Sequence, residues 1–237
     1  MAFIGIFAII ATPLSIYYFR QIKNKKTTIA DTHFAIKIVA AVLVICLIIK
    51  ISINAATGFS KMFLPFSLSD FTIFVMLFYA FTKTNTNANK ISHNVLIIFC
   101  SLTMMTYLIY PTSIWSTTDD KMFNFTSFHS WFGMSSHFCY IGVFIWMILW
   151  RKYQIKTNQY LFSIITWAIL LLIVIVAAYS LNENYDHCYN FVSKKDVKDA
   201  KWWWTICWFL ILNVYGTGIF FLLKITNKFH LGKYNLL

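Results

Sequence analysis

The chain has 237 residues, of which 59% are hydrophobic, 19% aromatic and only 12% charged, with a formal net charge of +12. A soluble domain carries about one quarter charged residues, so this composition argues against a water-soluble enzyme and against a disordered chain. With only seven Gly and three Pro, the apolar residues must lie in long continuous runs. Such runs exclude a disulfide miniprotein and a porin-type barrel.

These apolar runs predict an all-α, polytopic bundle of transmembrane helices that forms a single integral membrane domain, 1–237. A spanning helix needs about 20 mostly apolar residues, and seven segments meet that requirement. The predicted spans are 2–19, 34–53, 62–82, 91–110, 128–150, 160–181 and 202–223. Basic residues follow the first run instead of preceding it, unlike in a cleavable signal peptide. We therefore interpret the first run as a helix whose N-terminus lies outside.

The basic residues predict the orientation of the bundle. Loops and ends on one side carry 12 of the 20 Lys and Arg residues, against one acid, Asp31. The opposite side carries six basic and six acidic residues. The positive-inside rule places the first side, with the C-terminus, in the cytoplasm of a multi-pass protein of the cell membrane. Because the basic residues are divided among short segments, no nucleic-acid binding is expected.

Two ionisable residues lie well inside the predicted spans. Asp70 belongs to the third span and His137 to the fifth, and both spans enter the membrane from the outer side. At about 1.5 Å per residue both lie roughly 12 to 14 Å below the outer boundary, and Asn213 of the seventh span reaches a similar depth. An ionisable group in hydrocarbon is unfavourable. The pair therefore predicts either a ligand-binding or catalytic site, or an interhelical hydrogen bond that stabilises the bundle.

Further polar residues extend this candidate site. Ser67 and Ser69 flank Asp70 in the sequence, while His129, Asn184 and Tyr185 lie near the expected outer mouth. A catalytic triad of Ser69, His137 and Asp70 is not expected, because neighbours on a helix point about 100° apart.

Other ionisable residues receive structural interpretations. Asp186, His187 and Cys188 are consecutive in a loop and lack the spacing of zinc ligands, so neither a metal nor a cofactor is expected. Lys50 lies about one turn inside the second span, where its long side chain is expected to snorkel to the headgroups.

Several segments in order resemble one membrane-protein family. They are Leu64-Pro65-Phe66-Ser67-Leu68-Ser69-Asp70, Tyr110-Pro111-Thr112, the run from Phe128 to His137, and Asn184-Tyr185 followed by Trp202 to Trp204. Together they are similar to the bacterial YwaF-like family, whose eukaryotic relatives include a phospholipid acyltransferase. The resemblance implies acyl transfer on lipids if the chain is an enzyme.

Of the residues implicated in acyl transfer in those relatives, the resemblance leaves only His137. Ser67, Ser69 and Phe66 stand where the family or its relatives have His, Cys and Cys. A thioester mechanism needs an activated thiolate, which these positions lack.

The sequence thus predicts a membrane protein whose outer-half polar cavity, built around Asp70 and His137, binds or processes a lipid or small amphiphile. Two alternatives remain open: a transporter or substrate-binding component for a small molecule, and a non-catalytic assembly subunit of a membrane complex. Membrane lipids are the expected partners, and a second membrane protein is the expected partner under the last alternative.

Overall fold

The computed structural model describes residues 29–61, 64–83, 86–109, 128–149, 157–189 and 200–230. The first predicted span, 2–19, and the segment Tyr110-Pro111-Thr112 lie outside the described residues. The described part is all-helical, as predicted. Its elements are α2 (Ile29–Ala56), α3 (Leu68–Phe81), α4 (Asn87–Ile109), α6 (Phe128–Leu149), α7 (Thr157–Leu181), the short 3-10 helix η2 (Tyr185–His187) and α8 (Trp202–His230).

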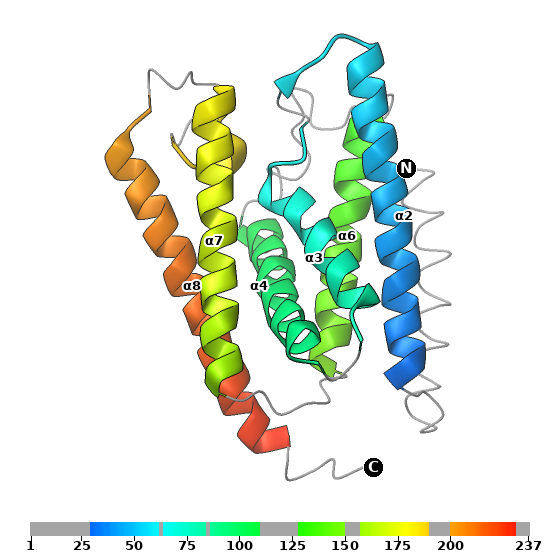
Figure 1. Ribbon diagram of the computed structural model, residues 1–237, viewed down its shortest axis with the longest axis vertical. Coiled ribbons are helices and arrows are strands. Elements are labelled where there is room, and N and C mark those ends of the chain that lie inside the picture. The colour runs from blue at the N-terminus through cyan, green and yellow to red at the C-terminus, as the bar shows by residue number, and fades with distance from the viewer. Residues whose placement is uncertain are drawn as a thin grey trace.

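The helices pack side by side around α4. In Figure 1, α7 and α8 lie at one side of the bundle, α2 and α6 at the other, and α3 and α4 between them. Helix α4 packs against α3, α6 and α7, and its residues Val95 to Cys100 are at most 1% exposed. A helix that is apolar and buried on all sides forms the core of a bundle.

The outer faces of the peripheral helices are apolar and exposed. Three described segments are long and apolar enough to cross a membrane: Ile36–Ala56, Asn158–Leu181 and Trp202–Leu222. Large side chains such as Ile48, Val176 and Val214 are more than half exposed on these helices. An exposed apolar surface of this extent is unfavourable in water and suits contact with lipid.

Helix α3 is shorter than the sequence predicted. Of the predicted span 62–82, the described residues 64–82 are helical only over Leu68–Phe81, 14 residues, which is roughly 21 Å against the roughly 30 Å of a hydrocarbon core. The apolar run continues before this helix, but Pro65 disfavours helical backbone in the residue before it. Ser67 then caps the helix by accepting a hydrogen bond from the Asp70 backbone N–H. Figure 1 shows α3 beginning well below the end of α2.

Close packing of α7 on α8 depends on one glycine. The Trp167 ring is fully buried, packs edge-on against Phe99 of α4 at 4.8 Å between centroids, and donates from Nε1 to the Leu212 carbonyl at 3.0 Å. A Cβ atom at Gly216 would lie only 2.8 Å from Trp167 Nε1. The absence of a side chain at Gly216 therefore lets α8 approach the indole.

Hydrogen bonds between side chains join α4 to α7 near the beginnings of both helices. Gln159 donates to Asn87 at 2.8 Å, and Asn94 donates to Ser163 at 3.1 Å. Asn94, Gln159 and Ser163 are buried. Interhelical bonds of this kind stabilise membrane bundles.

Candidate functional site

An ion pair between α2 and α3 forms the centre of the candidate site. Lys50 Nζ lies 3.3 Å from Asp70 Oδ1 and 3.4 Å from Oδ2, and the two side chains are only 12% and 5% exposed. Lys50 stands six residues before the end of α2 at Ala56, which is roughly 9 Å along the helix. The prediction that Lys50 snorkels to the headgroups is wrong. Its side chain turns inward because a buried carboxylate needs a cation beside it.

Two serines at the start of α3 complete the environment of Asp70. The Ser67 hydroxyl donates to Asp70 Oδ2 at 2.7 Å and accepts from the Asp70 N–H at 3.2 Å. The Ser67 and Ser69 hydroxyl oxygens are 2.8 Å apart. Since Ser67 has one hydroxyl hydrogen and gives it to the carboxylate, Ser69 is the donor to Ser67. The sequence Ser67-Leu68-Ser69-Asp70 therefore builds a cap and a carboxylate site at once.

Helix α6 contributes Tyr140 and His137. Tyr140 donates its hydroxyl to the Ser69 carbonyl at 2.8 Å, which ties α6 to α3. The His137 ring lies 5.7 Å from the Tyr140 ring, and the charges of Asp70 and Lys50 both act on it. Within the described residues, however, no hydrogen bond joins His137 to Asp70; the partners of Asp70 are Lys50 and Ser67.

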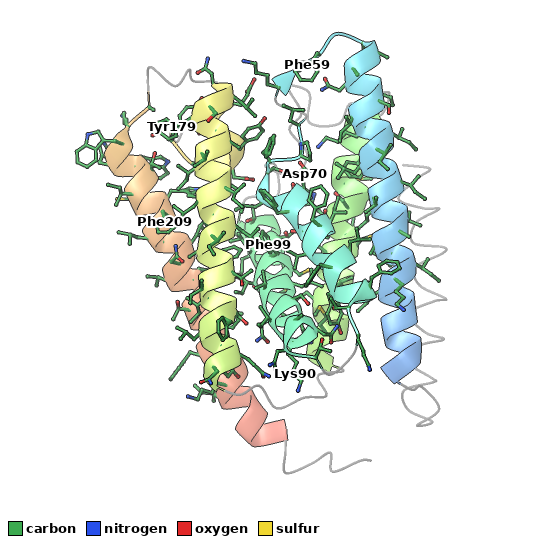
Figure 2. All side chains as sticks on the ribbon, viewed as in Figure 1. Phe59, Asp70, Lys90, Phe99, Tyr179 and Phe209 are labelled. Carbon is green, nitrogen blue, oxygen red and sulfur yellow. The ribbon has the colours of Figure 1, made fainter. Side chains whose placement is uncertain are left out.

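The tautomer of His137 follows from its own helix. His137 Nδ1 lies 2.5 Å from the Gly133 carbonyl. A carbonyl only accepts, so Nδ1 carries the hydrogen, and in the neutral ring Nε2 is left as an acceptor. We name the residues Lys50, Ser67, Ser69, Asp70, His137 and Tyr140 the polar cluster. Figure 2 shows Asp70 at the upper end of α3, below the end of α2.

The other predicted site residues lie elsewhere. Asn213 donates to the Phe209 carbonyl of its own helix at 2.8 Å, and α8 packs against α7 and α4. Asn184 accepts from the Tyr189 N–H at 3.1 Å. The Tyr185 hydroxyl donates to the Lys61 carbonyl. His129 lies in the first turn of α6, but its side chain is outside the described part of the structure. The structure therefore does not bring all the predicted residues together: Asn213 bonds within α8, and Asn184 and Tyr185 make contacts in the loop around η2.

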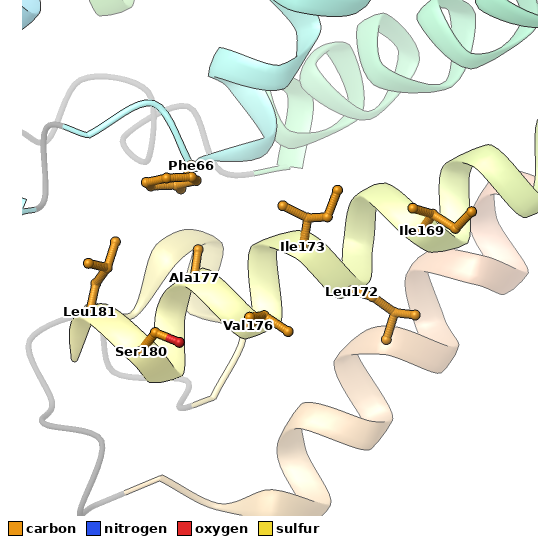
Figure 3. Close-up of a pocket in the computed structure, with 8 residues that line it drawn as sticks. All are labelled: Phe66, Ile169, Leu172, Ile173, Val176, Ala177, Ser180 and Leu181. Carbon is orange, nitrogen blue, oxygen red and sulfur yellow. The ribbon is translucent and has the colours of Figure 1, made fainter.

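A groove lies beside the polar cluster, between α7 and the segment that precedes α3. Its volume is about 460 Å³, within the usual range of small-molecule sites of about 300 to 1,000 Å³. Seven lining residues come from one stripe of α7 and the eighth is Phe66 (Figure 3). All are apolar except one: Phe66, Ile169, Leu172, Ile173, Val176, Ala177, Ser180 and Leu181. None of the site residues predicted from the sequence lines it, so the concave surface is apolar and adjoins the polar cluster through Phe66-Ser67.

The predicted site missed three residues that the structure places at or next to the cluster. Lys50 could have been found by asking which cation lies near the same end of the bundle as Asp70. Tyr140 lies about one turn after His137, and nothing in the hydrophobic pattern of this span distinguishes it from its apolar neighbours. Asp186 looked like part of a loop, yet its carboxylate accepts from the Leu68 N–H at 2.6 Å. Among the described residues, no group of three or more His, Cys, Asp or Glu side chains could hold a metal ion.

Comparison with known proteins corrects the resemblance drawn from the motifs. The family model described as the TMEM164 family matches residues 1–226, and nothing in the comparisons points to the bacterial YwaF-like family. The expectation of acyl transfer, which came only from that resemblance, is dropped with it. No curated protein and no solved structure matches the chain. The motifs behind the resemblance are short and degenerate.

Proposed function

This chain is a membrane protein that belongs to the TMEM164 family, and we propose that it binds a lipid or small amphiphile. The apolar chain of the ligand would lie in the groove of α7, and its polar part would meet the polar cluster. The observation that carries the proposal is an apolar groove whose lining residue Phe66 directly precedes Ser67, which donates to Asp70 of the buried Lys50–Asp70 ion pair. Ionisable groups inside a membrane bundle generally mark a functional site.

The irregular backbone before α3 supports this proposal. Residues 64–67 are not helical, although they lie below the end of α2 (Figure 1). Within a membrane, non-helical backbone is tolerated only where it is buried in protein or lines a cavity. Phe66 lines the groove and Ser67 joins the polar cluster. This short segment therefore connects an apolar surface to a polar one, as an amphiphile requires.

The groove suits a lipid chain that enters sideways from the bilayer. Val176 is 63% exposed and Ile169 is 50% exposed, so the groove opens on the outer face of the bundle. A chain lying there gains contact with Phe66 and a row of branched side chains without crossing the core. The polar cluster, which includes Ser67 next to Phe66, offers a polar group the Lys50 ammonium as a donor, and hydroxyl oxygens and His137 Nε2 as acceptors.

We also propose that the chain crosses the cell membrane seven times, with the N-terminus outside and the C-terminus cytoplasmic. The unequal distribution of basic residues supports this orientation. In it, the polar cluster and the groove lie in the outer half of the membrane.

Lipid photolabelling tests the proposed function. The full chain is reconstituted in nanodiscs of palmitoyl-oleoyl phosphatidylcholine that contain a phosphatidylcholine with a diazirine on one acyl chain. After irradiation, labelled peptides are mapped by mass spectrometry. We expect label on 169–181 of α7 well above label on the α8 segment around Val214, which is equally open to lipid at 71% exposure.

Two matched variants sharpen this test. Val176→Trp fills the groove and should remove the excess label on α7, whereas Val214→Trp places the same side chain on a lipid-facing helix outside the groove and should leave it unchanged. Equal labelling of α7 and α8 in the unsubstituted protein would show that the groove holds no lipid. The polar cluster would then serve only to hold the helices together, as in an assembly subunit.

A further inference from the structure

The turn η2 holds the segment that leads into α3. Tyr185 donates its hydroxyl to the Lys61 carbonyl, and its ring packs on Phe66 with centroids 6.1 Å apart. Asp186 accepts from the Leu68 N–H at 2.6 Å. Two consecutive residues of η2 therefore form hydrogen bonds with Lys61 and Leu68, on either side of the segment that leads into α3. Asp186 and Leu68 are 118 positions apart in the sequence.

Asp186 is itself held in an unusual conformation. Its φ is 51° and its ψ is 29°, in the left-handed region, which Asp and Asn tolerate better than most residues. Its carbonyl accepts from Trp208 Nε1 of α8 at 2.9 Å. The side chain of Asp186 is thus aimed at α3 by a backbone that α8 fixes from the other side.

The hydrogen bond to Leu68 helps to fix the start of α3, together with Pro65 and the Ser67 cap. The first N–H groups of a helix have no partner within the helix. Ser67 satisfies the N–H of Asp70, and Asp186 satisfies that of Leu68. Since Ser67, Ser69 and Asp70 all lie in this first turn, its position sets their distance from Lys50.

Resting on the proposed function, we propose that Asp186 is a positioning residue for the lipid site, whose carboxyl group holds the start of α3 more tightly when it is protonated than when it is ionised. A protonated carboxyl keeps one oxygen that accepts from Leu68, so the hold persists in the neutral form. An ionised carboxylate would accept a stronger hydrogen bond from Leu68, but in this partly buried position it loses more hydration than that bond returns.

The surroundings of Asp186 give the sign of the effect. Burial raises the pKa of Asp186 to about 7, and the negative charge of Asp70 raises it further, while the hydrogen bond from Leu68 and the positive charge of Lys50 act in the opposite direction. On its own turn, burial raises the pKa of the Cys188 thiol to about 12 and that of the Tyr185 hydroxyl above its ordinary range. Trp208, which reaches Asp186 from α8, does not ionise.

The difference between the pKa of Asp186 in the held state and its ordinary pKa sets how the hold depends on pH. The held state favours the proton, because its pKa exceeds the ordinary value of 3.8. The hold is therefore strongest below the ordinary pKa of 3.8, weakens as the pH rises above that value, and is lost as the pH rises through about 7. With a pKa of about 7, Asp186 is roughly nine-tenths protonated at about pH 6 and one-tenth protonated at about pH 8.

The experiment measures photolabelling of 169–181 in the same phosphatidylcholine nanodiscs across this pH range. For the unsubstituted protein we expect label to fall about tenfold between about pH 6 and about pH 8. Asp186→Asn, which has the shape of the protonated form and stays neutral, should give high label at every pH. Asp186→Ala, which has no acceptor for Leu68, should give low label at every pH. Glu183→Gln, a change of another acid in the same loop, should keep the original profile.

Three results would overturn the inference: a flat profile in the unsubstituted protein, a pH-dependent profile that persists in Asp186→Asn, or full label at low pH in Asp186→Ala. A profile that persists in Asp186→Asn would point to a histidine, which titrates in the same range. Hydrogen exchange of the peptide 64–72 separates this inference from the proposed function. If exchange there is faster in Asp186→Ala than in Glu183→Gln while no variant shows excess label on α7, the hold exists but the lipid site does not.

Discussion

At the scale of single residues, the Lys50–Asp70 ion pair has the largest expected electrostatic effect on stability, because both of its charges are largely buried. Neither charge is therefore well hydrated. Lys50 Nζ also lies 5.5 Å from the centroid of the Phe132 ring, which adds a weak cation–π attraction. Removing one partner leaves the other charge without compensation, and that is far less favourable than removing both.

The first prediction concerns this pair. Asp70→Asn should lower the free energy of unfolding by about 3 kcal/mol, whereas Lys50→Met combined with Asp70→Asn should recover much of that loss because no unpaired charge remains. Unfolding of the detergent-solubilised protein measures each value in a double-mutant cycle.

Lys83→Met serves as the control for this cycle. Lys83 is exposed, and its replacement should change stability by no more than about 0.5 kcal/mol. Strictly additive losses for Lys50 and Asp70 would show that the two charges do not depend on each other.

At the scale of elements, helix packing depends on where backbones approach closely. Trp167 of α7 contacts α4 and α8 at once, and its only described hydrogen bond crosses to the Leu212 carbonyl. Because the indole is fully buried, it cannot move aside without disturbing Phe99. The α7–α8 contact is therefore sensitive to the volume of the residue at position 216.

The second prediction compares two glycines on α8. Gly216→Ala places a Cβ atom 2.8 Å from Trp167 Nε1, so we expect a loss of about 1 to 3 kcal/mol in the free energy of unfolding. Gly218→Ala is the matched control, since a Cβ there meets nothing within 4 Å. Because alanine favours a helix over glycine, this control should be neutral or stabilising by up to about 1 kcal/mol. Equal destabilisation by both substitutions would contradict the packing argument.

At the scale of the whole molecule, burial is distributed as expected for a bundle in lipid. The core runs through α4, and the apolar surfaces of α2, α7 and α8 face outward. An exposed lysine, Lys61, follows α2 and another, Lys83, follows α3. The end of α2 and the end of α3 lie at opposite ends of the bundle (Figure 1).

The third prediction tests the proposed orientation. In a Cys207→Ser background, which removes the exposed native thiol, a membrane-impermeant maleimide should label Lys61→Cys in intact cells. Lys83→Cys should be labelled only after the membrane is permeabilised. The reverse pattern would invert the proposed orientation, and labelling of both in intact cells would contradict a bundle that crosses the membrane between these positions.

Local sequence was sufficient for most of the described helices and for the position of Asp70 inside one of them, where it is buried. Hydropathy located α6 within one residue of its observed bounds and α7 within three, because a long apolar run has few alternatives to a helix. It failed at the start of α3, where Pro65 and the Ser67 cap end the helix inside an apolar run. The family could not be read correctly from short motifs.

The sequence by itself thus determined an all-helical membrane protein with one carboxylate buried among apolar residues, because hydrophobicity and helical hydrogen bonding are local properties of the chain. Only the tertiary structure decided which groups meet that carboxylate. Lys50 lies 20 positions from Asp70, and Asp186 lies 118 positions from Leu68. Such contacts depend on how helices rotate and pack against one another, and hydrophobic periodicity does not encode the rotation of one helix relative to its neighbour.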